Sequence, residues 1–164
     1  MTILRHRPNI LPALVPAAAL LLTATGCSAT NTTARLTVPE PPGETAALCR
    51  SLDGKLPDTV GGLDRNDPRP ESVLTAGWGD DPAIVLRCGI PRPERLSELT
   101  DGGNVNGVDW AVERLADGGW RATTTLRKAY VEVVADREHG ADLGPLTDLA
   151  EPVKKAIPEG IASY

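Results

Sequence analysis

The side chains in this sequence that are best suited to chemistry are three cysteines, a histidine and a pair of adjacent aspartates. A cysteine or serine nucleophile needs a histidine base, and after the first ten residues the only histidine is His139. It stands in the charged stretch DREHGAD without a nucleophile motif, which is typical of a solvent-exposed turn. Asp80 and Asp81 are candidates for an acid–base pair or a cation site, but Asp-Asp-Pro between two apolar runs favours a turn. We therefore predict no catalytic residue.

The familiar signatures of enzymes and metal sites do not occur in the sequence: GxSxG, HExxH, a P-loop, GxGxxG and CxxC. Residues 102–113 come nearest to an EF-hand, because a loop glycine at Gly107 puts Asn104, Asn106 and Glu113 on ligand positions. Gly102 then occupies the first position, which requires an aspartate, and Asn-Gly is a hairpin-turn signal. We expect no metal and no cofactor.

The first cysteine, Cys27, follows an N-terminal sequence that resembles a secretory leader. A basic segment precedes an apolar run over residues 10–22, and thirteen residues are too few to span a bilayer, which takes about 20. The sequence ATGC that ends at Cys27 resembles the lipobox of bacterial lipoproteins, whose cysteine is lipidated and becomes the new N-terminus. We expect residues 1–26 to be a signal peptide and Cys27 to carry the lipid that anchors the protein at the outer face of the cell membrane.

Two alternatives to lipidation stay open. The lipobox most often has leucine three residues before the cysteine, where this chain has Ala24. Ala24 and Gly26 also satisfy the small-x-small rule of ordinary signal peptidase, and cleavage there would release a secreted protein. In the other alternative the leader is not cleaved and is itself the anchor.

Residues 28–43 are polar and rich in threonine and proline, without apolar periodicity. This composition predicts a tether, so that 27–43 comprises the lipidated cysteine and a flexible segment with a reach of roughly 20–25 Å. A single domain over residues 44–158 and a short tail over 159–164 complete the predicted organisation.

After residue 26 the chain is acidic, with 15 basic and 22 acidic residues and a net charge of −7, because the leader holds two of the 17 basic residues and no acid. A spread negative charge disfavours nucleic acids and anionic membrane surfaces, since both attract basic patches. The expected partners are the membrane, through Cys27, and an envelope protein.

The periodicity of the domain predicts a helix, a run of strands and a second helix. Thr45, Cys49, Leu52 and Leu56 form one apolar stripe of the first helix. Pro152 must kink the closing helix or begin a second one. The sum is an α+β fold: an antiparallel sheet of four to five strands with an N-terminal and a C-terminal helix packed on one face. The strands are predicted at 73–78, 83–90, 108–115, 120–126 and 129–135, and the closing helix at 142–157.

If Cys27 is lipidated, two cysteines are left, Cys49 and Cys88. Outside the cytoplasm, the simplest expectation is that these two form a disulfide. Cys49 lies on the helix stripe and Cys88 on the inward face of a strand, so helix-on-sheet packing can bring them together. Closing a loop of about 40 residues would stabilise the fold by roughly 4 kcal/mol. Unpaired buried thiols, or a cysteine nucleophile with His139 as base, are the alternatives.

The three tryptophans Trp78, Trp110 and Trp120 occupy alternating strand positions, which favours core packing over a carbohydrate-binding platform. Arg87 lies on the strand face opposite Cys88, and its role is left open. If the domain binds a small ligand, Trp78, Arg87 and Asp109 form the predicted binding surface.

The motifs WGDDPAIVLRCGIPRP, NGVDWAVE and AYVEV, in this order, resemble the actinobacterial family called domain of unknown function 3515, which is commonly described as a family of lipoproteins. The resemblance covers about residues 48–157, and Ala111 stands where the family often has a larger, aromatic residue. It implies a membrane-associated extracytoplasmic protein without a known activity. The matching positions are Trp78, Pro82, Arg87, Cys88, Gly89, Pro91, Asp109, Trp110, Tyr130 and Glu132.

Three hypotheses for the function follow. The leading one is a non-enzymatic, lipid-anchored domain that binds a partner or stabilises an envelope assembly. The second is a small-ligand binding module, secreted or anchored. The third is an enzyme of unrecognised type that uses Asp80 and Asp81, or His139.

Overall fold

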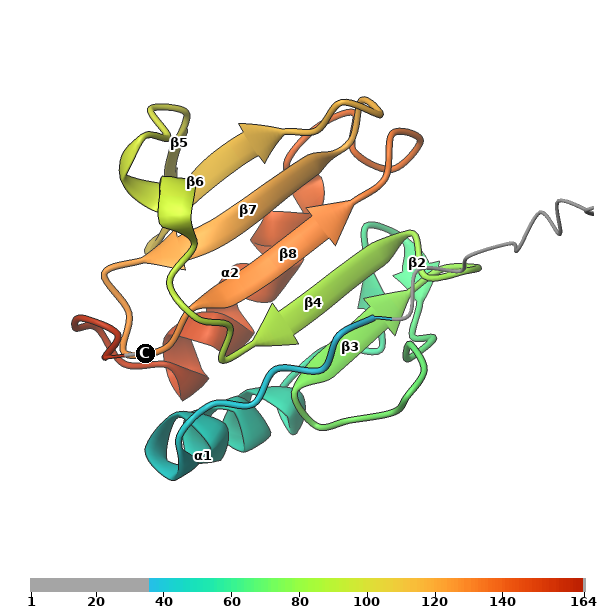
Figure 1. Ribbon diagram of the computed structural model, residues 1–164. Coiled ribbons are helices and arrows are strands. Elements are labelled where there is room, and N and C mark those ends of the chain that lie inside the picture. The colour runs from blue at the N-terminus through green and yellow to red at the C-terminus, as the bar shows by residue number, and fades with distance from the viewer. Residues whose placement is uncertain (1–35, 164) are drawn as a thin grey trace, which may run out of the picture. The chain divides into compact units, whose positions relative to one another are not determined.

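A computed structural model describes residues 36–163, and its main feature is a six-stranded antiparallel sheet (Figure 1). The predicted signal peptide, Cys27 and the first part of the tether lie outside the described residues. Within residues 36–163, no helix is long and apolar enough to cross a membrane. The strands of the sheet are β3 (Thr75–Trp78), β4 (Ile84–Cys88), β5 (Gly102–Val105), β6 (Val108–Arg114), β7 (Trp120–Thr125) and β8 (Val131–Ala135).

The order of the strands in the sheet is β3-β4-β8-β7-β6-β5. The hairpin of β3 and β4 is followed by a connection with a short 3-10 helix, η1 (Glu94–Ser97), that crosses the front of the sheet to the far edge (Figure 1). Strands β5 to β8 then run back, so that β8 pairs with β4, and Arg87 lies opposite Glu132. Two very short strands, β1 (Thr59–Val60) and β2 (Leu63–Asp64), form a separate hairpin.

The fold is α+β, as predicted, but the sheet has six strands where four to five were expected. The additional strand, β5, contains two glycines and an asparagine and is largely exposed, so it has no apolar alternation by which it could be recognised. What identifies β5 as a strand is its antiparallel pairing with β6, to which the Asn106-Gly107 turn connects it. Both turn residues have positive φ, 48° and 87°, which confirms the hairpin predicted there and suits the twist of the strands.

All three tryptophans are buried in the core, on the sheet face that packs against the helices, as predicted. The indole of Trp78 donates to the Pro57 carbonyl at 3.1 Å, and that of Trp120 to the Asp142 carbonyl at 3.0 Å. The indole N–H of Trp110 has no hydrogen-bond partner within residues 36–163. Two large rings are thus fixed in orientation as well as buried, because a buried N–H needs an acceptor.

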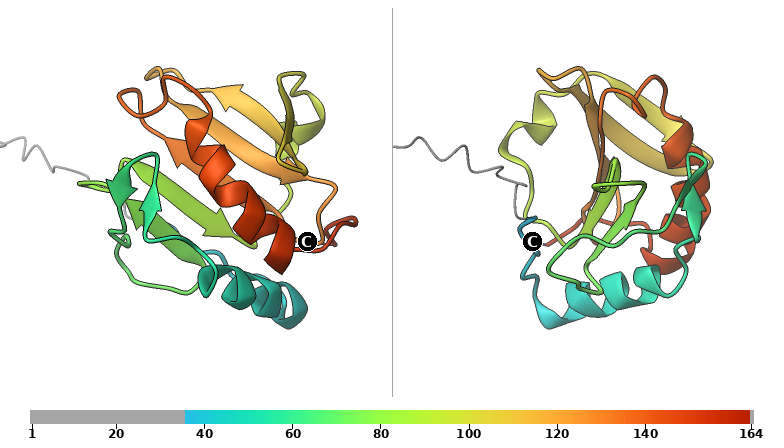
Figure 2. Two further views of the ribbon diagram at one scale, coloured as in Figure 1. Left: turned by 180° about the vertical axis from the view of Figure 1, so that it is seen from behind. Right: turned by 90° about the vertical axis from the view of Figure 1, so that its right-hand side faces the viewer.

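The helices are α1 (Gly43–Asp53) and α2 (Gly144–Ala156). Figure 2 shows α2 along one face of the sheet, where Leu146, Leu149 and Val153 are fully buried. It is a single helix that continues through Pro152. The first helix contacts α2 and lies beneath the end of the sheet formed by β3 and β4, so the predicted placement of both helices on one face is only approximate (Figures 1 and 2).

A disulfide joins Cys49 of α1 to Cys88 at the end of β4, which confirms the predicted pairing. The two Cα atoms are 5.5 Å apart and the sequence separation is 39 residues. The bridge therefore connects the first helix to β4, the strand next to one edge of the sheet.

The chain before α1 packs against this bridge. Pro39 is buried, and a Cβ at Gly89 would lie 2.7 Å from the ring of Pro41 and 3.3 Å from the sulfur of Cys49. Gly89 has φ of 81°, so the position requires glycine both for its backbone conformation and for the close approach. The last residues of the predicted tether, 36–42, are thus packed onto the domain.

Candidate functional site

A groove of about 980 Å³ lies beside β3 and β4, and we call it the β3–β4 groove. One wall is the loop 66–71, and the other is formed by the turn between β3 and β4. Most of the lining side chains are exposed, so it is a surface groove and not an enclosed cavity. Its lining residues are Leu36, Asn66, Asp67, Pro68, Arg69, Pro70, Glu71, Asp81, Pro82 and Val85.

Hydrogen bonds fix the loop wall of the groove to β3. The side-chain amide of Asn66 donates to the carbonyl of Gly79 at 2.8 Å. The carboxylate of Asp67 accepts from the Gly77 amide at 3.2 Å and from Arg65. These contacts occupy polar groups at the outer edge of β3, so the wall is held in one position before any ligand binds.

The guanidinium of Arg65 also holds this loop, through its contact with Asp67. It lies 5.4 Å from the centre of the Trp78 ring and bonds Asp53 at 2.9 Å as well as Asp67. Burial lowers the pKa of Arg65, but the hydrogen bonds and charges of the two aspartates outweigh it and raise the pKa above its ordinary value. The group stays charged and links α1 to the groove wall.

The groove is acidic. Its lining contains the carboxylates of Asp67, Glu71 and Asp81 against one guanidinium, that of Arg69, which gives a net charge of −2. Asp67 is engaged by Arg65, whereas neither Glu71 nor Asp81 has a polar partner among the described residues. The carboxylates of Glu71 and Asp81 are therefore available to pair with a ligand. The structure places Asp80 and Asp81 in the predicted turn, with Asp81 at φ of 44°.

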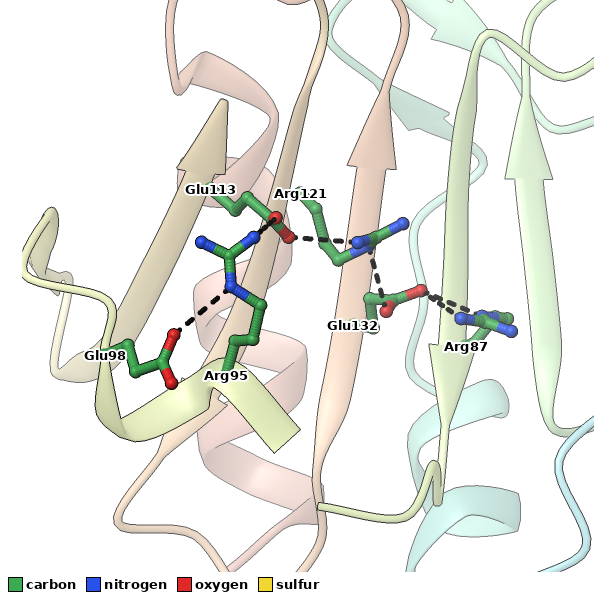
Figure 3. A network of polar contacts seen from close by, with 6 residues as sticks. All are labelled: Arg87, Arg95, Glu98, Glu113, Arg121 and Glu132. Atoms are coloured by element: carbon green, nitrogen blue, oxygen red, sulfur yellow. Dashed lines mark hydrogen bonds and ion pairs between the residues drawn. The ribbon is translucent and has the colours of Figure 1, made fainter. Parts of the chain in front are cut away.

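A chain of ion pairs crosses the other part of the sheet surface (Figure 3). At its centre the side chain of Glu132 is only 5% exposed, and one of its oxygens accepts from the Nε and Nη2 atoms of Arg87, at 2.9 and 2.6 Å. The second oxygen lies 3.3 Å from Nε of Arg121, an ion pair without hydrogen-bond geometry.

The same chain of ion pairs continues to η1. Glu113 lies 3.0 Å from Arg121 and 3.5 Å from Arg95, which in turn reaches Glu98 at 3.3 Å (Figure 3). Three arginines thus face three glutamates, with no net charge. Arg87, whose role the sequence left open, belongs to this internal network and does not present a free charge to a ligand.

The predicted binding surface of Trp78, Arg87 and Asp109 is not assembled into one pocket. Trp78 is buried on the helix side of the sheet, and Arg87 lies on the opposite face. Asp109 borders a smaller hollow of about 300 Å³ beside Arg127, and it accepts from Asn104 at 3.0 Å. The β3–β4 groove, which sequence reasoning missed, contains none of the three.

His139 is paired with Asp136, whose carboxylate contacts both the ring and the backbone amide at 2.9 Å. Partial burial raises the pKa of Asp136, but these two hydrogen bonds outweigh it and lower the pKa below its ordinary value of 3.8. The pairing closes the turn after β8. Over residues 36–163, no group of three or more His, Cys, Asp or Glu side chains lies close enough to hold a metal ion.

Comparison of the sequence with known families identifies the family of the chain. Neither the curated proteins nor the solved structures contain a match to the chain. One family model does match, under the description protein of unknown function (DUF3515), and it covers residues 9–162. That is nearly the whole chain, which therefore belongs to the DUF3515 family.

Proposed function

We propose that this protein is an extracytoplasmic lipoprotein, anchored through Cys27, whose domain is a non-enzymatic binding or accessory module of the cell envelope. The observation that carries the proposal is the Cys49–Cys88 disulfide. Disulfides form and persist in oxidising compartments and are rare in the cytosol.

The disulfide also bears on Cys27. The sequence has three cysteines, and the bridge uses both that lie in the domain. Cys27 is the one that remains, and it is the last residue of the lipobox-like sequence that follows the short apolar run. A lipid on this residue accounts for a lone cysteine in an otherwise disulfide-bonded protein.

A binding role agrees best with the surface of the domain. The ion-pair network around Glu132 and the pairing of His139 with Asp136 satisfy these groups internally. Free charged groups line the β3–β4 groove, where Glu71 and Asp81 face solvent. A preformed groove with free charges suits recognition of a partner. A small-ligand module is the second candidate, and the groove volume of about 980 Å³ is the observation in its favour.

Detergent-phase partitioning of the full-length protein, made in cells with lipoprotein processing, tests the anchor. We expect the unaltered chain in the detergent phase and its Cys27→Ser variant, after leader cleavage, in the aqueous phase. Ser28→Ala is the matched control and should partition like the unaltered chain. Equal partitioning of the cleaved Cys27→Ser variant and the control into the detergent phase would contradict the proposal.

A further inference from the structure

We propose that the β3–β4 groove binds an extended, basic peptide segment of a second membrane-associated protein. The lining of the groove indicates the peptide chemistry. The assignment of the peptide to a membrane-associated protein rests on the proposed anchor at Cys27.

The groove has rigid walls, and half of its lining residues are apolar. Pro68 and Pro70 form part of one wall and Pro82 part of the other, with Val85 of β4 also in the lining. Proline has a fixed φ, and the loop is pinned to β3 by the hydrogen bond from Asn66 to Gly79. Little conformational entropy is therefore lost when a ligand binds against these walls, which favours affinity.

The charge of the groove selects the ligand. Glu71 on the loop and Asp81 on the turn have no polar partner in the described part of the chain, and both side chains are exposed. Lysine or arginine side chains of a ligand would pair with them, whereas an acidic ligand or an anionic lipid surface would be repelled. Because Asp67 is already paired with Arg65, the charges left for a ligand are those of Glu71, Asp81 and Arg69, and the excess of one carboxylate favours a basic ligand.

The form of the groove favours a peptide over a small molecule. Small-molecule pockets cover most of their ligand, roughly 70–90% of its surface. Here six of the ten lining residues are exposed, so a ligand would be covered from one side only. An extended peptide suits such a surface, because alternate side chains contact the groove while the others remain in water.

The position of Leu36 connects the groove to the membrane. Leu36 lines the groove and is nine residues after Cys27, and a chain of this length spans at most about 30 Å. A lipid on Cys27 therefore keeps the groove within about that distance of the bilayer. The peptides within reach are those of proteins at the same membrane surface.

Fluorescence polarisation with a labelled peptide of Lys-Val-Pro repeats tests the peptide chemistry. The proline keeps the probe extended and prevents its strands from pairing. We expect saturable binding to the full-length protein in neutral detergent below about 1 mM. A peptide of Glu-Val-Pro repeats is the control probe and should not bind. Absence of saturable binding for the lysine probe, or equal binding of both probes, would overturn the proposal.

Two double variants locate the site. Glu71→Gln with Asp81→Asn removes both free charges, and asparagine tolerates the positive φ at position 81. We expect binding to weaken about 2- to 30-fold, the range that two exposed ion pairs give. The matched control, Glu94→Gln with Asp101→Asn, removes two exposed carboxylates outside the groove and should leave the affinity unchanged. Equal weakening in both double variants would place the binding elsewhere.

The experiments distinguish failure of the proposed lipid anchor from failure of the proposed peptide site. If Cys27 carries no lipid but the lysine probe binds in a manner that depends on Glu71 and Asp81, the peptide site is supported and the membrane partner is overturned. If Cys27 is lipidated and the probe does not bind, the anchor is supported and the peptide site is overturned.

Discussion

Replacing Glu132 by glutamine removes a buried charge from the sheet surface. Its side chain is 5% exposed, while those of Arg87 and Arg121 are 26% and 38% exposed. Glutamine keeps the size of the side chain and one of its oxygens, but it removes the negative charge that the guanidinium groups of Arg87 and Arg121 face. Removal of one partner of a fully buried ion pair costs about 3–5 kcal/mol, and the contact of both arginines with water reduces this. We expect the free energy of unfolding to fall by about 2–3 kcal/mol.

Urea unfolding measures this change through the midpoint, provided that the slope m is unchanged. The control is Glu98→Gln at the outer end of the same network, where the side chain is 67% exposed and an effect below about 0.5 kcal/mol is expected. A double-mutant cycle of Glu132→Gln with Arg87→Gln should give a coupling of at least about 1 kcal/mol. A loss below about 0.5 kcal/mol for Glu132→Gln, or equal losses for the two glutamates, would show that the Glu132 charge does not stabilise the sheet.

Three further perturbations follow from the fold. Changing both Cys49 and Cys88 to serine should lower the free energy of unfolding by about 4 kcal/mol, measured in urea, because it reopens a loop of 39 residues; no loss would contradict the role of the bridge. Gly89→Ala should cost about 2 kcal/mol or more, whereas Gly103→Ala, with open space around its Cβ position, should have little effect. Asp136 has a lowered pKa in the folded state, so its contribution to stability is present above the ordinary pKa of 3.8 and is lost as the pH falls below it. Asp136→Asn should therefore flatten the fall of unfolding free energy between about pH 5 and pH 2, and an unchanged profile would contradict this.

Local patterns were sufficient to predict the parts of the fold that depend on near neighbours. The alternation around Trp78, Trp110 and Trp120 placed these rings in the core, and Asn106-Gly107 indicated its hairpin. The disulfide was predictable because the apolar periods put both cysteines on inward faces.

Contacts between distant segments were not predictable from those patterns. The pairing of Arg87 with Glu132 depends on which strands become neighbours, and these residues are 45 positions apart. The β3–β4 groove is formed by residue 36, the loop 66–71 and the turn at residue 81. In the sequence, each of these lies in a segment that resembles an ordinary polar loop. The only sequence signal of the groove is the proline-rich stretch DRNDPRPES, which predicts a loop and not a site.

The mass of the N-terminal peptide, measured on the protein isolated from cells, is the direct test of a lipid anchor on this disulfide-bonded domain. We expect the mature chain to begin at Cys27 and this residue to carry the added mass of a diacylglyceryl group. A mature chain that begins elsewhere, or an unmodified Cys27, would contradict it.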